Sequence, residues 1–63
     1  MNIIEIAVQL HAESERAVRV SDDGESNNAV WIPKSQIEAQ QDLGNGVIEL
    51  SLPEWLALDK GLI

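Results

Sequence analysis

Aliphatic side chains alternate with polar or small ones at the beginning of the chain. Between Asn2 and Leu10, every second residue is a large aliphatic one, and the aliphatic set is Ile4, Ile6, Val8 and Leu10. A period of two residues is typical of a β-strand that buries one face. We therefore predict a strand over residues 2–10. The polar residues 11–15 are predicted to form a connection.

Three later segments repeat this period, at residues 16–21, 29–32 and 47–52. Between the first two lies Asp23-Gly24, a strong turn pair because glycine adopts positive φ at little steric cost. These two strands should therefore form a β-hairpin. Gly44-Asn45-Gly46 predicts a second tight turn, before the last strand.

Proline and glycine mark the other boundaries. Pro33 cannot donate a hydrogen bond to a neighbouring strand, so it ends the third strand, and residues 33–38 suit a single helical turn. Residues 39–42 are polar and predict no strand. A C-terminal helix should follow, since Ser51 and Glu54 have capping-box spacing.

The end of that helix has two further sequence signals. Gly61 is placed for a left-handed C-cap, and Leu62 could then pack back onto the last turn. The apolar face of the helix is predicted to carry Trp55 into the core, together with Leu52, Leu56 and Leu58.

These elements predict one domain over residues 1–63, of the α+β class and mainly β. We expect a four-stranded antiparallel meander or a small open SH3-like or OB-like barrel, with a short helical turn and a C-terminal helix. A domain of 63 residues buries only ~60% of its unfolded surface, and the chain has no cysteine for disulfides. Good packing or self-association must make up for the small buried surface and the missing disulfides, and this favours a homodimer.

The charge balance restricts the partners. Eleven acidic residues against four basic ones give a net charge of −7, which disfavours nucleic acid and an anionic membrane. A basic protein partner is favoured, since opposite charge speeds encounter. The sequence has neither a signal-peptide pattern at its start nor an apolar stretch of ~18 residues, so a cytoplasmic location is expected.

Three residues are the binding candidates: Trp31, Arg19 and Lys34. Alternation places Trp31 opposite to Val30 and Ile32, on the outer face of the hairpin that Arg19 should share. A tryptophan beside cations can stack a base, a nucleotide or a partner's side chain. The alternative is that Trp31 packs beneath the C-terminal helix, or that the sheet is buried on both sides.

Other polar groups carry no site prediction. His11 lies near Ser14, which nothing marks as an activated nucleophile, so His11 is expected to be a surface histidine. Three carboxylates in one loop, those of Asp22, Asp23 and Glu25, lack the spacing of an EF-hand and predict a solvated turn. No catalytic residue, metal site or cofactor is predicted.

Two segments resemble a known group of proteins. They are Val30–Ile37, with the sequence VWIPKSQI, and Ile48–Ala57, with the sequence IELSLPEWLA and the later residues KGLI at 60–63. They are similar to small uncharacterised bacteriophage and prophage proteins with a W-[IL]-P-K-S-Q-I segment and a P-E-W-L-A-x-x-K-G-L tail. Here Leu58-Asp59 replaces the more usual charged pair. The resemblance implies an accessory phage protein acting on a host component, and it implies no mechanism.

The leading hypothesis is a non-enzymatic binding module for a host protein. The alternative is capture of a small, nucleotide-like ligand at a dimer interface through Trp31, Arg19 and Lys34. Single-stranded nucleic-acid binding, or acidic mimicry of nucleic acid, is a further alternative. Enzymatic activity is not expected.

Overall fold

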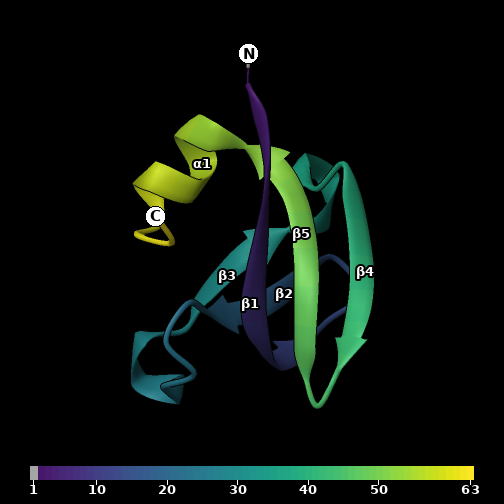
Figure 1. The fold of residues 1–63 in the computed structure, drawn as a ribbon, viewed down its shortest axis with the longest axis vertical. Helices are drawn as coiled ribbons and strands as arrows, with labels where there is room; N and C mark the ends of the chain where they lie inside the picture. The colour runs from purple at the N-terminus through teal and green to yellow at the C-terminus, as the bar shows by residue number, and fades with distance from the viewer. Residues whose placement is uncertain (1) are drawn as a thin grey trace.

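The computed structural model describes residues 2–63 and shows a mainly β domain, one antiparallel sheet of five strands with a short C-terminal helix (Figure 1). The strands are β1 (Ile3–Glu13), β2 (Ala17–Ser21), β3 (Val30–Pro33), β4 (Ala39–Gly44) and β5 (Val47–Pro53). The helices are the 3₁₀ turns η1 (Ser26–Asn28) and η2 (Lys34–Gln36) and the α-helix α1 (Glu54–Asp59).

The strand order is β3-β2-β1-β5-β4, which corrects the predicted four-stranded meander. The sheet is also open, with β3 and β4 at its two edges, and does not close into a barrel. The β2–β3 hairpin is confirmed. The last strand pairs with the first: β5 pairs with residues 3–9 of β1, and β2 pairs with residues 9–13.

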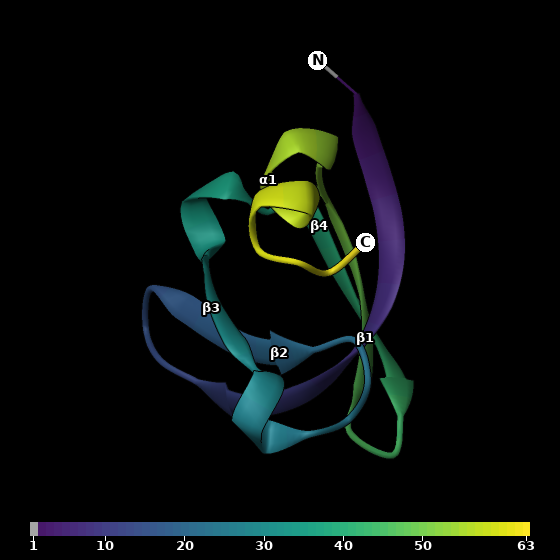
Figure 2. The same ribbon diagram turned by 90° about the vertical axis from the view of Figure 1, so that its left-hand side faces the viewer.

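β1 also extends three residues beyond its predicted end, through His11 to Glu13. The register with β2 shifts between Leu10 and Ala12, the mark of a β-bulge, which bends a strand and increases its twist. Figure 2 shows β1 curving along the molecule from the β5 side to the β2 side. The bend lets one sheet surround the core on more than one side.

β4 is the element that sequence reasoning missed. Its residues are all exposed, on both faces of the strand, and it pairs on one side only, with β5. Alternation reports burial on one face, so a strand without a buried face has no such signal. The Gly44-Asn45-Gly46 turn is confirmed: Asn45 and Gly46 both have positive φ, as a two-residue hairpin turn of type I′ requires.

The core lies on the concave side of the sheet, where α1 covers it (Figure 2). The predicted alternation is confirmed, because the aliphatic residues of β1, β2, β3 and β5 supply most of this core, and α1 and the C-terminal turn supply the rest. Its buried members are Val8, Val18, Val20, Ile32, Ile48, Leu50, Leu52, Leu56, Ala57 and Leu62. Ile37, after the η2 turn, packs against it as expected.

The helix begins differently from the prediction. Pro53 is its N-cap and no side chain caps it, so the predicted capping box is absent. Ser51 lies in β5 instead, and the backbone N–H of Glu54 donates to the carbonyl of Asn2 at 2.8 Å. Six helical residues present only one narrow face to the sheet, and Leu56 and Ala57 occupy it.

Trp55 and Leu58 consequently point to solvent, and the prediction that they belong to the core is wrong. The C-terminal signal is confirmed. Gly61 has φ +73°, the N–H of Leu62 donates to the carbonyl of Ala57 at 2.8 Å, and Leu62 is buried. This is a Schellman motif with its hydrophobic contact. Within residues 2–63, no helix is long and apolar enough to cross a membrane.

Candidate functional site

Trp31 and Arg19 are direct cross-strand neighbours on β3 and β2. The pairs on either side, Val18 with Ile32 and Val20 with Val30, turn toward the core, so Trp31 and Arg19 lie on the opposite face. Trp31 is 47% exposed and does not pack beneath α1. The structure therefore brings together two of the three predicted binding residues on an open surface.

The β2–β3 loop holds Arg19 in place. Nη2 of Arg19 donates a hydrogen bond of 2.8 Å to the carbonyl of Ser26, in η1. The loop is ordered in turn by Asp23, whose carboxylate accepts from the backbone N–H of Glu25 at 2.9 Å and from the side-chain amide of Asn28 at 2.7 Å. The carboxylate of Asp23 thus supports the hairpin that carries Trp31.

The pKa of Asp23 lies below its ordinary value of 3.8, chiefly because of the N–H of Glu25 and then the amide of Asn28. A lowered folded-state pKa gives stability that is present above the unfolded value and is lost as pH falls through the folded one. We expect Asp23→Ala to lower the melting temperature at pH 6, with the difference from wild type shrinking below pH 3.8. Thermal melts across this range check it, with Asp22→Ala as the equal-charge control. A difference that stays constant with pH would contradict the assignment.

Lys34 does not join Trp31 and Arg19. Its Nζ forms an ion pair of 2.6 Å with Oε2 of Glu13, at the end of β1. In the β1–β2 register, Glu13 lies opposite Val18, whose side chain faces the core, and not opposite Arg19. Both predicted cations thus have partners within the chain, and an anionic ligand would have to compete with them.

His11 is half-buried rather than a surface residue, and its Nε2 lies 2.7 Å from Oγ of Ser21 in β2. Sequence reasoning considered Ser14, which instead closes the β1–β2 turn by accepting from the N–H groups of Arg16 and Ala17. Ser21 is completely buried, so a substrate has no path to its Oγ. The pair is a satisfied internal hydrogen bond, and no sequence signal joins two residues ten positions apart.

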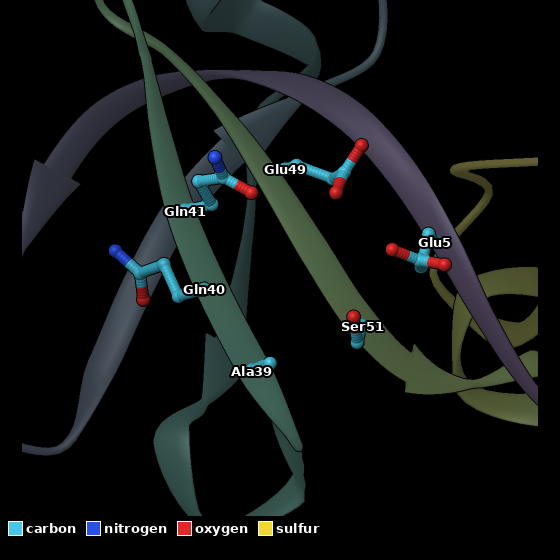
Figure 3. Close-up of a pocket in the computed structure, with 6 residues that line it drawn as sticks. All are labelled: Glu5, Ala39, Gln40, Gln41, Glu49 and Ser51. Atoms are coloured by element: carbon cyan, nitrogen blue, oxygen red, sulfur yellow. The ribbon is translucent and has the colours of Figure 1, made fainter.

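A second surface feature depends on β4 and was not predicted. It is a hollow of about 350 Å³ on the outer face of β1, β5 and β4, which we call the acidic hollow (Figure 3). Its lining residues are Glu5, Ala39, Gln40, Gln41, Glu49 and Ser51. Its two charged residues are both carboxylates. Across the described part of the chain, no three histidine, cysteine or acidic residues gather as a metal site would require.

Comparisons with protein-family models, with curated proteins and with solved structures find no match to this chain. The resemblance to phage proteins therefore stays a prediction.

Proposed function

We propose that the chain is a non-enzymatic binding module whose partner is a protein, as expected of a phage-encoded accessory protein that acts on a host component. One observation carries this proposal. The chain has only two aromatic residues, Trp31 and Trp55, and they are 47% and 52% exposed. Every buried member of the core is aliphatic.

Burial of an indole is among the largest hydrophobic contributions that a small domain can obtain, because an aromatic side chain buries 150–250 Å². In this chain, both tryptophans keep much of that area in contact with water. Tryptophan and arginine are the residue types most enriched among interface hot spots. Trp31 has Arg19 directly beside it, which makes this pair the best candidate for the contact surface.

The charge of the molecule favours a basic partner. A net charge of −7 attracts a cationic protein surface and speeds its association. The nucleotide-like alternative has less support, because Arg19 already donates to Ser26 and Lys34 already pairs with Glu13. Nucleic-acid binding would need cations that the chain does not supply in excess.

Trp31→Ala tests this proposal. Removing a hot-spot tryptophan costs at least about 2 kcal/mol of binding energy, so we expect the affinity for the partner to fall at least about 30-fold. The partner is first isolated on immobilised wild-type protein, and its affinity for each variant is then measured by titration calorimetry. Ile63→Ala, which trims another exposed apolar side chain, is the control.

The melting temperature of Trp31→Ala should stay close to wild type, so a weaker complex would report the surface and not the fold. We also expect the association rate to fall with added salt, as for an acidic surface meeting a basic one. Unchanged affinity after both Trp31→Ala and Trp55→Ala would refute the proposal.

A further inference from the structure

β4 forms an edge of the sheet that the chain leaves open. Among residues 2–63 it pairs only with β5, and all its residues are exposed. In an antiparallel edge strand, every second residue directs its N–H and C=O groups away from the sheet. Residues 39–42 thus offer backbone donors and acceptors on a side where no strand lies.

The opposite edge shows how this chain protects a strand when it does so. β3 has only four residues, ends in Pro33, which lacks an N–H, and is bounded by the η1 and η2 turns. Short length and proline are common protections of an edge strand. β4 contains neither proline nor lysine, and its register irregularity lies at its end, between Asp42 and Gly44.

The acidic hollow lies directly beside this open edge. Ala39 and Ser51 are opposite one another in the β4–β5 register, and both are short, which opens the space. Figure 3 shows the carboxylates of Glu5 and Glu49 directed into the space between β1 and β5. The ion pair found among residues 2–63 joins Lys34 to Glu13, so neither of these two carboxylates takes part in it.

We propose that β4 is a strand-addition site for an extended segment of a basic protein, with a lysine or arginine of that segment reaching over β4 toward Glu49 on β5. Neighbouring strands lie ~4.8 Å apart, so β5 would lie ~10 Å from an added strand, a span that a long basic side chain and the side chain of Glu49 cover together. Glu5 lies on β1, ~14 Å from an added strand, and contributes negative charge to the acidic hollow without direct contact. Backbone hydrogen bonds would provide affinity and the acidic hollow would provide selectivity. This surface is separate from the Trp31–Arg19 pair, and the inference holds or fails independently of that pair.

A second copy of the chain fits this edge less well than a basic segment. The four basic residues are Arg16, Arg19, Lys34 and Lys60, and none of them lies on β4 or β5. Pairing β4 with β4 would bring no cation to the acidic hollow and would join two chains of charge −7. Charge complementarity therefore selects a basic partner.

An NMR titration tests the site with defined peptides. The probe is a seven-residue peptide that alternates arginine with threonine, added to the ¹⁵N-labelled protein. One matched peptide carries N-methyl groups at alternate backbone nitrogens, and another has glutamate in place of arginine. We expect chemical-shift changes for the amides of β4 and of residues around Glu5 and Glu49. Both matched peptides should bind at least ~10-fold more weakly than the arginine peptide, a loss that corresponds to ~1.4 kcal/mol.

Charge variants complete the test. Glu49→Gln and Glu5→Gln should each weaken binding of the arginine peptide. Glu15→Gln, the same change on the exposed β1–β2 turn, should leave that binding unchanged. Trp31→Ala should leave the affinity for this peptide unchanged. Equal affinity for the N-methylated peptide would overturn strand addition, and so would shifts centred on Trp31. A dimer in sedimentation that is disrupted by changes in β4 would assign the edge to a second copy and would also overturn the proposal.

Discussion

Leu50→Ala is expected to destabilise the domain by about 2–5 kcal/mol, the range for truncation of a buried leucine. Leu50 is fully buried in β5, between Ile6 of β1 and Gln40 of β4 in the register. Marginal stability of 0.05–0.15 kcal/mol per residue corresponds to about 3–9 kcal/mol for a chain of this length. The substitution should therefore leave a large unfolded fraction at room temperature.

Urea unfolding followed by circular dichroism measures this loss. Leu43→Ala is a matched control, since Leu43 lies on β4 and is 49% exposed. It should change the free energy of unfolding by less than about 0.5 kcal/mol, as is usual for a surface substitution. Similar losses for the two variants would show that the core is not where the structure puts it.

Leu62→Ala is expected to have the second large effect, a loss of about 2–4 kcal/mol. A helix of six residues is far below the ~12–15 residues at which isolated helices become marginal in water, so tertiary packing must hold α1 in place. Leu62 is buried in the core, and its backbone N–H closes the Schellman turn by donating a hydrogen bond to the carbonyl of Ala57. Losing its side chain should release the helix from the concave face.

The neighbouring residue provides the control. Ile63 follows directly in the chain but is 53% exposed, so Ile63→Ala should leave the melting temperature nearly unchanged. Released packing in Leu62→Ala should also raise binding of a dye that reports exposed apolar surface. Equal melting temperatures for the two variants would contradict the structure of the C-terminal turn.

The candidate surfaces differed in how far the sequence could predict them. Period-two alternation placed Trp31 and Arg19 on one face of a hairpin, and the structure confirms both the pairing and the exposure. Lys34 could not be placed in this way, because it lies just after the strand and its direction depends on Glu13, far away in the chain. The acidic hollow could not be predicted from the sequence, since its walls come from β1, β5 and the unpredicted β4.

By itself, the sequence determined the local features of this protein. These are the four strands that bury a face, the two hairpin turns and the glycine that ends the helix, because each depends on side-chain alternation or on backbone freedom within a few residues. The tertiary structure alone decided that β1 pairs with β5, that β4 is a strand, and that Trp55 faces solvent. Strand order and helix orientation depend on which apolar faces fit together across the whole chain, and an edge strand without a buried face acquires its conformation from its neighbour.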